Sequence, residues 1–342
     1  MNSVIPLLRQ VRKKPQKDSQ VLSIDLGSTS GRVMVGSRLV WHEPSCIAIH
    51  VPSNTVIAVG HKAYGYLGKS SEQVKIVFPL QNGVVSDQQS FEQLLQAILA
   101  TINKNATVWQ MIFGFEGTYA TLATQSPLER KILKESFAAV GLGRLEERNQ
   151  LLAASEYLHL TQRAGSSYCI VQLGGQVTEI ALVSGGKIEV ARRLIHAGIY
   201  CTEHIQDSIK QKKECMVSWQ TAELLKLQLA VVSPDGACAR QKISVRGKNI
   251  ITNLGETITV SNEEIASVMT EFATEILEAI QELFTQAPTD ITTNCLENGL
   301  YMIGGSAQIK GLDQFLQKHL QMEVLVCPEP EKTIVRGLAM ID

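Results

Sequence analysis

The alternation of apolar and polar residues predicts two strand–turn–strand hairpins that resemble each other. The first spans residues 21–35 and breaks at Gly27-Ser28-Thr29-Ser30-Gly31. The second breaks at Leu173-Gly174-Gly175-Gln176 and returns as a strand from Thr178 to Val183. Aligning Leu26 with Leu173 separates the two copies by 173 − 26 = 147 residues. Two copies of one hairpin, about half a chain apart, suggest an internal duplication.

Apolar residues at helical spacing predict helices between and after the two hairpins. These helices are Phe91–Asn103, Leu128–Val140, Thr202–Lys212, Thr221–Leu229 and Asn262–Phe284. Ser261 with Glu264 three residues later is a capping-box pattern for the last of them. Residues 243–260 predict a β-hairpin with its turn near Arg246-Gly247-Lys248-Asn249. Strands that alternate with helices imply an α/β architecture.

The first twenty residues differ from the rest of the chain. On a helix, Val4, Leu7, Leu8 and Val11 would share one face, and Arg9, Arg12 and Lys13 would lie opposite. A basic amphipathic helix of this kind can lie in a membrane interface, and many copies on one assembly could bind by avidity. A frayed, solvated tail is an equal alternative, so a peripheral membrane contact through residues 1–17 stays open.

Composition removes several classes of function. The chain has 32 basic and 33 acidic residues, which gives no general reason to expect a nucleic-acid partner. No apolar run is long enough to span a membrane, and the basic start is not followed by the apolar core of a secretory signal. The seven cysteines are scattered without a close pair, so we expect small buried apolar residues in a reducing cytoplasm instead of a zinc site.

Both hairpins have the chemistry of a phosphate-binding turn. Glycine lets the backbone approach an anion closely, and Ser28, Thr29 and Ser30 add hydroxyl donors. Asp25 precedes the first turn, where a carboxylate could hold a magnesium ion through water. A single Gly-Ser turn usually binds nothing. Two related turns would close on a triphosphate from opposite sides.

The residues around these turns resemble a known family. Residues 24–35, IDLGSTSGRVMV, resemble the first phosphate loop of the actin, Hsp70 and sugar-kinase superfamily. Further segments resemble the MreB branch, and together they span nearly the whole chain after residue 20. These segments are 41–49, 58–63, 67–68, 78–87, 245–248, 257–261 and 301–313. The chain is thus similar to a divergent MreB-type bacterial actin.

The resemblance implies an actin-like fold. Two duplicated α/β halves with ribonuclease H-like cores would enclose a central nucleotide cleft. The implied boundaries are a tail at 1–20, a first half at 21–155, a second half at 156–325, and a segment at 326–342 that returns to the first half.

The resemblance also implies a site for ATP or ADP with Mg²⁺. Asp25, Gly27, Ser28 and Thr29 would form the first phosphate loop, with Asp25 near the magnesium ion. Gly174, Gly175 and Thr178 would belong to the second loop. Glu223 and Lys226 would reach the ribose and base, and Gly304, Gly305 and Ser306 would let the adenine approach the backbone. The structural alternative for Glu223 and Lys226 is an ordinary surface ion pair. The alternative for Gly304 and Gly305 is a plain strand-to-helix turn.

The chain departs from the family where hydrolysis is expected to occur. Gln172 replaces the carboxylate of the second loop, Gln176 replaces its third glycine and Val177 a threonine. Gln150 stands where a glutamate would orient the water, although a shifted alignment would offer Glu146, Glu147 or Glu156. Ile199 and Tyr200 replace an acidic pair. Positioned acid–base groups typically contribute ~10²–10⁴-fold each, so we expect a weak or lost ATPase that still binds ATP.

By resemblance we expect a cytoskeletal filament of identical subunits that acts in cell shape or internal organisation. Head-to-tail contacts that do not close would form an open filament. Another MreB-type protein is a possible partner, and the inner face of the cell membrane is the expected location. The first alternative is a non-polymerising pseudo-ATPase that acts as a scaffold or regulator of a conventional filament. A small-molecule kinase would need a carboxylate aimed at a substrate hydroxyl, and none can be placed.

Overall fold

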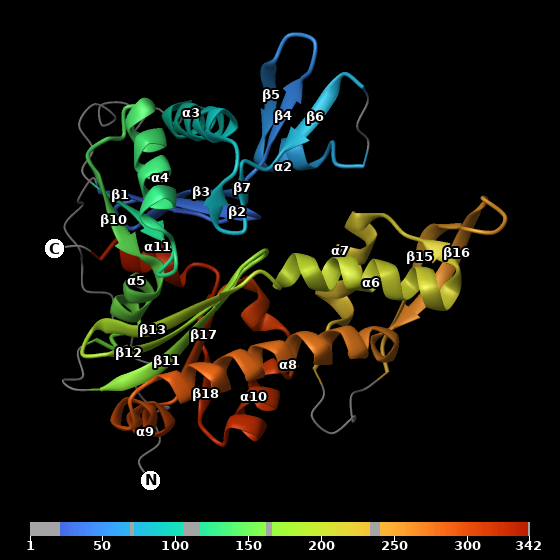
Figure 1. Ribbon diagram of the computed structural model, residues 1–342. Helices are drawn as coiled ribbons and strands as arrows, with labels where there is room; N and C mark the ends of the chain where they lie inside the picture. The colour runs from blue at the N-terminus through green and yellow to red at the C-terminus, as the bar shows by residue number, and fades with distance from the viewer. Residues whose placement is uncertain (1–20, 69–71, 105–116, 162–165, 233–239, 341–342) are drawn as a thin grey trace.

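The computed structural model describes residues 21–68, 72–104, 117–161, 166–232 and 240–340. Each half of the chain contains a five-stranded sheet, and the two sheets face each other across the molecule (Figure 1). The first sheet has the order β3-β2-β1-β9-β10, and the second has the order β13-β12-β11-β17-β18. The strands of the first sheet are β1 (Leu22–Leu26), β2 (Ser30–Val35), β3 (Arg38–Pro44), β9 (Gly117–Thr121) and β10 (Leu145–Asn149). Those of the second are β11 (Ser167–Leu173), β12 (Thr178–Ser184), β13 (Lys187–Leu194), β17 (Leu300–Ile303) and β18 (Val324–Val326).

The two sheets repeat one pairing scheme. In each, the first three strands are antiparallel neighbours, and two parallel strands follow on the other side of the first. The hairpin turns also match, because Gly27 N–H donates to the carbonyl of Ser30 at 3.1 Å and Gly174 N–H to that of Val177 at 2.9 Å. Both pairs are 147 positions apart (174 − 27 and 177 − 30). The predicted duplication and actin-like α/β architecture are confirmed.

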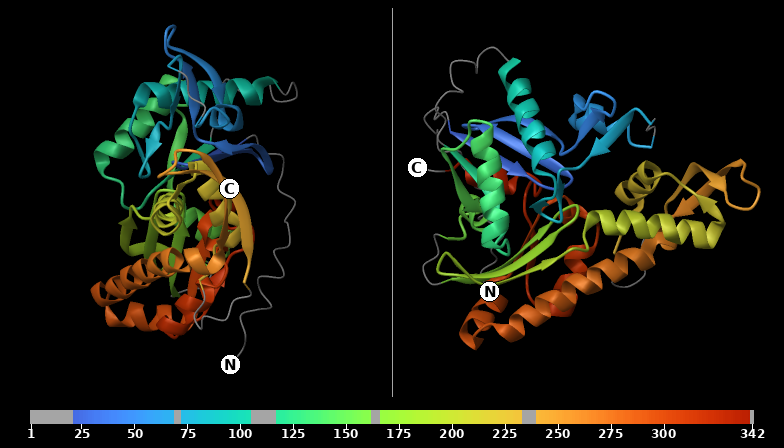
Figure 2. Two further views of the ribbon diagram at one scale, coloured as in Figure 1. Left: turned by 90° about the vertical axis from the view of Figure 1, so that its right-hand side faces the viewer. Right: turned by 45° about the horizontal axis from the view of Figure 1, so that its top comes forward.

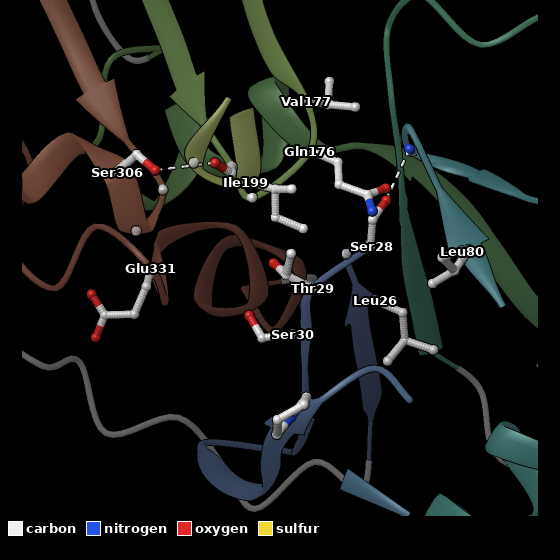
Figure 3. Close-up of a pocket in the computed structure, with 18 of the residues that line it drawn as sticks. Leu26, Ser28, Thr29, Ser30, Leu80, Gln176, Val177, Ile199, Ser306 and Glu331 are labelled. Atoms are coloured by element: carbon white, nitrogen blue, oxygen red, sulfur yellow. Dashed lines mark hydrogen bonds between the residues drawn. The ribbon is translucent and has the colours of Figure 1, made fainter. Parts of the chain in front are cut away.

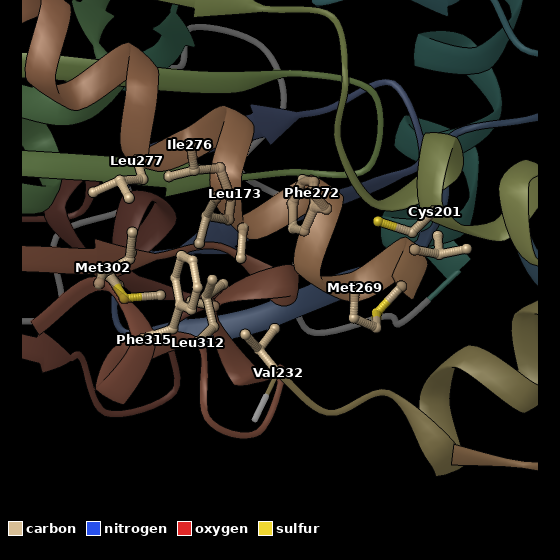
Figure 4. Packing of buried hydrophobic residues seen from close by; sticks show 14 of the residues in the cluster. Leu173, Cys201, Val232, Met269, Phe272, Ile276, Leu277, Met302, Leu312 and Phe315 are labelled. Carbon is tan, nitrogen blue, oxygen red and sulfur yellow. The ribbon is translucent and has the colours of Figure 1, made fainter. Parts of the chain in front are cut away.

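Helices cover the outer faces of both sheets. Helix α3 (Gln88–Lys104) and helix α4 (Pro127–Ala139) pack on the first sheet, where the rings of Tyr119 and Phe137 lie 4.6 Å apart. The second sheet is covered by α6 (Gly198–Lys213), α8 (Asn262–Gln286), α9 (Thr289–Asn298) and α10 (Leu312–Leu320). Helix α8, drawn in orange, lies on the side of the second sheet away from the first half (Figure 2). Its residues Met269, Phe272 and Ile276 enter a core with Leu173 and Met302 (Figure 4).

Two short helices fill the space between the sheets. Helix α5 (Gln150–Tyr157) follows the first sheet but packs on Tyr168 and Ile170 of the second. Helix α11 (Thr333–Leu338) follows the second sheet but contacts β1, β2 and β9 of the first. The helices cross closely, since a Cβ atom on Gly337 would lie 1.8 Å from the carbonyl oxygen of Ala153. The halves therefore exchange their last helices.

Each half carries a small three-stranded sheet, and both lie on the same side of the molecule (Figure 1). The first consists of β4 (Ile47–His50), β5 (Thr55–Val59) and β6 (Val74–Val77) with α2 (Gly60–Tyr64), followed by the two-stranded hairpin β7 (Leu80–Gln81) and β8 (Val84–Val85). The second consists of β14 (Cys215–Met216), β15 (Lys242–Asn249) and β16 (Gly255–Ser261) with α7 (Trp219–Leu229).

The predicted turn of the second small sheet is wrong. Residues 246–249 lie within β15, and the turn comes after Asn249, whose Oδ1 accepts hydrogen bonds from the N–H groups of Ile251 and Thr252. Gly247 has a different role. A Cβ atom there would lie 2.4 Å from the Cys215 sulfur, so the glycine allows β14 to pack against β15.

The other predicted elements agree with the structure. All five predicted helices are present, each with ends within a few residues of those expected. Ser261 N–H donates to the Glu264 carboxylate at 2.6 Å at the start of α8. Six of the cysteines are buried free thiols, and Cys238 lies outside the described residues, as does the 1–20 tail. Among the described helices, none combines the length and apolar character needed to cross a membrane.

Candidate functional site

A cavity of about 1340 Å³ lies between the two halves and is lined by both hairpin turns (Figure 3). The inner faces of the sheets supply its floor, because Asp25 and Arg32 on one sheet and Gln172 on the other point toward the opposite half. The structure brings nearly all of the predicted site residues to this cavity. They are Asp25, Gly27, Ser28, Thr29, Gln150, Gln172, Gly174, Gly175, Glu223, Lys226, Gly304, Gly305 and Ser306.

Thr178 is the predicted site residue that does not line the cavity. It is fully buried as the first residue of β12, and its hydroxyl donates to the carbonyl of His196 at 3.3 Å. Glu146, Glu147 and Glu156 also lie outside the cavity lining. Glu146 and Glu147 are exposed on β10, and Glu156 pairs with Arg148 at 3.3 Å.

The first hairpin contains a pair of opposite charges. Asp25 and Arg32 are register partners on β1 and β2, and Arg32 Nη1 lies 4.0 Å from Asp25 Oδ2. Both side chains are nearly buried. Burial raises the pKa of Asp25, and the charge of Arg32 opposes that rise. The Nε–H of Arg32 is buried and has no hydrogen-bond partner among the described residues.

The donor set around Asp25 does not fit a magnesium ion. Magnesium prefers oxygen ligands, several of them water, around one or two free carboxylates. Asp25 is already paired with a guanidinium, and the neighbouring inner-face position on the other sheet is the amide Gln172. In the described part of the chain, His, Cys, Asp and Glu form no group of three or more that could hold a metal.

The hairpin of β7 and β8 connects the two phosphate-loop candidates. Asn82 and Gly83 form its turn with φ of 50° and 79°, the conformation that an Asn-Gly pair favours. Gly83 N–H donates to the Ser28 hydroxyl at 3.0 Å, and Asn82 N–H donates to Oε1 of Gln176 at 2.8 Å (Figure 3). The side chain of Gln176, which replaces the third glycine of the family's second loop, thus accepts a hydrogen bond from the opposite half.

The tips of the two hairpins touch. A Cβ atom on Gly175 would lie 2.2 Å from Cγ2 and 2.3 Å from Oγ1 of Thr29. Glycine at 175 is therefore required for the observed separation of the tips. The carbonyls of Gly174 and Gly175 accept hydrogen bonds from the N–H groups of Gly198 and Ile199, which fixes this loop on the start of α6.

The second hairpin contains a buried acid where the first has Arg32. Glu179, the register partner of Gln172, has no exposed surface. Its Oε1 accepts from the N–H and hydroxyl of Thr124 at 3.1 and 2.9 Å, and its Oε2 accepts from Gln150 Nε2 at 2.9 Å. Burial raises the pKa of Glu179, and the hydrogen bonds from Gln150 and Thr124 oppose that rise. Gln172 Oε1 is buried and has no hydrogen-bond partner in the part of the chain that the structure describes.

Glu223 and Lys226 join α6 to α7 at the side of the cavity. The ammonium of Lys226 donates to the carbonyl of Gly198 at 2.7 Å and to Thr202 Oγ1 at 2.9 Å, and it lies 2.7 Å from Glu223. Its side chain is 11 % exposed, so the pair is not an ordinary solvated surface pair. Its three N–H donors are matched by three acceptors.

The turn after β17 leaves an open space in the cavity wall. Gly304 has φ +88°, and a Cβ atom there would lie 2.4 Å from the Leu173 carbonyl oxygen, so this position requires glycine. A Cβ atom on Gly305 would have no neighbour within 4 Å. The Ser306 hydroxyl donates to the Gly174 carbonyl at 3.1 Å. A flat ligand can therefore approach the backbone at Gly305.

Contacts of α2 and the loop after it with α7 join the two halves at the cavity wall. The rings of Tyr64 and Trp219 meet edge to face with centroids 6.0 Å apart, and Gln220 Nε2 donates to the carbonyl of Leu67. These residues line the cavity and belong to opposite halves. The halves are thus held together on two sides of the cavity.

The sequence interpretation missed Arg32 and Glu179. Arg32 is the one charged residue of β2 (SGRVMV), and Glu179 is the one charged residue of β12 (TEIALVS). A charged residue inside a buried strand usually requires a partner, and this signal was present in the sequence. The strand register that places Arg32 beside Asp25 and Glu179 beside Gln172 was not evident from it.

Comparisons with known proteins agree with this geometry. The family described as MreB/Mbl protein matches residues 19–342. The cell shape-determining protein Mbl of Bacillus subtilis is 28 % identical over 325 residues, which cover 94 % of this chain and 95 % of that protein. A crystal structure of MreB5 of Spiroplasma citri bound to ADP superimposes with a TM-score of 0.86 at 24 % identity, covering 93 % and 94 % of the two chains. The MamK double helical filament gives a TM-score of 0.75 at 18 % identity, covering 93 % and 97 %.

Proposed function

Because the chain belongs to the MreB/Mbl family, we propose that it binds ATP or ADP between its halves and assembles head to tail into actin-like filaments. The observation that carries the proposal is the convergence of the two duplicated turns on one cavity whose wall is open at Gly305. The cavity-lining backbone around Gly27 and Gly174 suits a phosphate chain, and the space at Gly305 suits a base. The solved relative from Spiroplasma citri holds ADP, and the MamK relative forms a double helical filament.

Substitution at Gly305 tests nucleotide binding with little effect on the fold. Gly305→Val adds a branched side chain to the cavity without a protein neighbour at its Cβ position. We expect at least about a tenfold loss of ATP and ADP affinity by calorimetry, since the ligand and the valine would compete for the same space. Gly305→Ala is the matched smaller change and should lose less.

The thermal midpoint without nucleotide should be the same for both variants and the natural chain. Unchanged affinity in Gly305→Val would place any bound nucleotide away from this wall. Absence of ATP and ADP binding by the natural chain would remove the proposal altogether.

The hydrolytic step is proposed to be weak or lost. Gln172 and Gln150 stand at the two positions where a carboxylate would act on water, and an amide cannot act as a base. Gln150 is also tied to Glu179, which is buried behind the cavity wall. Phosphate release from ATP should therefore be close to background. A clear rate that disappears in Asp25→Asn would contradict this part of the proposal.

A role in cell shape or internal organisation follows from the family and from the name of the Mbl relative. The alternative is a non-polymerising scaffold that binds a conventional MreB-type filament, which the amides at Gln172 and Gln176 favour. Sedimentation with and without ATP separates the two. Pelleting of the purified chain alone supports the filament, and pelleting only with a second MreB-type protein supports the scaffold.

Three further expectations remain predictions. The boundaries at 155/156 and 325/326 and a location at the inner face of the membrane depend on the resemblance. The membrane contact of residues 1–17 depends on the basic amphipathic pattern of that segment. Flotation with anionic vesicles, with and without residues 1–20, tests the membrane contact. Loss of flotation on deletion of the tail would support it, and equal flotation would contradict it.

A further inference from the structure

The cavity contains a fixed positive charge at the place where a magnesium ion was expected. Arg32 is the only arginine among the described residues that line the cavity, and it points from β2 toward the second half beside Asp25. The 4.0 Å between Arg32 Nη1 and Asp25 Oδ2 is longer than a hydrogen bond. The Nε–H of Arg32 is buried and has no hydrogen-bond partner within residues 21–68, 72–104, 117–161, 166–232 and 240–340. The guanidinium therefore makes no hydrogen bond to Asp25, and the Arg32 side chain, which is 12 % exposed, lines the cavity.

We propose that Arg32 binds the phosphate chain of the nucleotide directly and replaces magnesium, so that this chain binds nucleoside di- and triphosphates independently of the metal. The inference rests on the proposed nucleotide binding at the same cavity. Arg32 is the group that would compensate the phosphate charge in that cavity.

The chemistry of the guanidinium fits this role. Arginine stays protonated at all relevant pH values, and its planar fork of N–H donors matches two phosphate oxygens at once. A hydrated magnesium ion in the same place would be repelled by Arg32, whose positive charge already lies 4.0 Å from the carboxylate of Asp25. The neutral Gln172 opposite adds no charge to attract a metal and offers Oε1 as an acceptor.

A purely structural ion pair is the competing explanation. In that case Arg32 serves only to compensate the buried charge of Asp25, and removal of both charges together should leave nucleotide binding intact. The double variant Asp25→Asn/Arg32→Met removes both charges at nearly constant volume. It separates the two explanations, because a phosphate would lose its cationic partner in the double variant as well.

The experiment is calorimetric titration of ADP and ATP into the full-length protein, once with excess magnesium chloride and once with EDTA. For the natural chain we expect affinities that agree within about threefold between the two conditions. Arg32→Met and the double variant should each lose about ten- to a hundredfold, the usual contribution of charged hydrogen bonds. Arg32→Lys should recover part of this loss. The thermal midpoint of each variant without nucleotide verifies that it folds.

Each result has a defined meaning. Loss of binding by the natural chain in EDTA overturns the inference, because a metal is then required, while nucleotide binding itself stands. The inference is also overturned if the double variant binds nucleotide as tightly as the natural chain does, since Arg32 then acts only on Asp25. No binding of the natural chain in either condition removes the proposed function and the inference together. Metal-independent binding that is weakened in both variants supports the inference.

Discussion

The two hairpins at the centre of the molecule share a backbone but differ in their inward-facing charges. Asp25 and Gln172 are equivalent positions, as are Arg32 and Glu179, each pair 147 residues apart (172 − 25 and 179 − 32). The first hairpin presents the carboxylate of Asp25 and the guanidinium of Arg32 to the cavity. The second presents a neutral amide to the cavity and buries its acid behind it.

The two copies of the hairpin therefore have different roles, one toward a ligand in the cavity and one in contacts between the halves. The first hairpin places Arg32 at the cavity, 4.0 Å from Asp25, and its Nε–H has no hydrogen-bond partner among the residues that the structure describes. The second uses its polar side chains to hold the halves together, through Glu179 to Thr124 and Gln150 and through Gln176 to Asn82. The shared glycine turn keeps the backbone in place while the side chains diverge.

The largest effect is expected from removing the buried acid of the second hairpin. Glu179→Ala leaves the donors of Thr124 and Gln150 without their acceptor beside the fully buried position 179. We expect a loss of about 2–4 kcal/mol in the free energy of unfolding, measured by urea denaturation. Glu179→Gln is the matched control and should retain most of the stability, because the amide of Gln150 can turn to complement it. Equal losses in both variants would show that the charge itself, and not hydrogen bonding, is needed.

An intermediate effect is expected where the two hairpins touch. Gly175→Ala places a methyl group against Thr29 and should cost about 1–3 kcal/mol of stability by overpacking. Thr29→Ala removes the two closest atoms, so the double variant should recover part of that loss. A double-mutant cycle by urea denaturation measures the coupling. Additive losses would mean that the tips are not in contact in solution.

The smallest effect is a dependence on pH that distinguishes the hairpins. Burial raises the pKa of Glu179 above its ordinary value of 4.5, so the folded protein holds this proton more tightly than the unfolded chain. The contribution of Glu179 to stability is therefore greatest at low pH and is lost as pH rises from the unfolded pKa to the folded pKa. Glu179→Gln lacks this titration. The free energy of unfolding of Glu179→Gln, relative to that of the natural chain, should therefore increase from pH 4 upward and then level off. Urea denaturation at each pH measures this difference. A difference that falls with pH would contradict the raised pKa.

Much of the fold could be predicted from local patterns. The glycine turns at Gly27 and Gly174 and the helical spacing of α8 depend only on nearby residues, so sequence alone located them. Gly247 was misread because its small size serves a contact with Cys215 and not a turn. Thr178 was placed in the site because the loop was identified, but the alternation of β12 turns its side chain away from the cavity.

The charged pairs of the site required information that only the tertiary structure contains. The pairing of Asp25 with Arg32 depends on strand register, and that of Glu179 with Gln150 and Thr124 depends on how the halves meet. The sequence departures at Gln150 and Gln172 were visible in isolation. Their partners were not, because those lie on other elements or in the opposite half.

The exchange of α5 and α11 constrains how the chain reaches its native state during synthesis. Met34 of the first sheet packs on Val335 of α11 and on Ala339, which follows that helix, about 300 residues later in the chain. The inner face of the first sheet thus stays uncovered while the whole second half is being translated. A ribosome-bound intermediate of the first half should expose this apolar face to chaperones and to neighbouring nascent chains until α11 emerges.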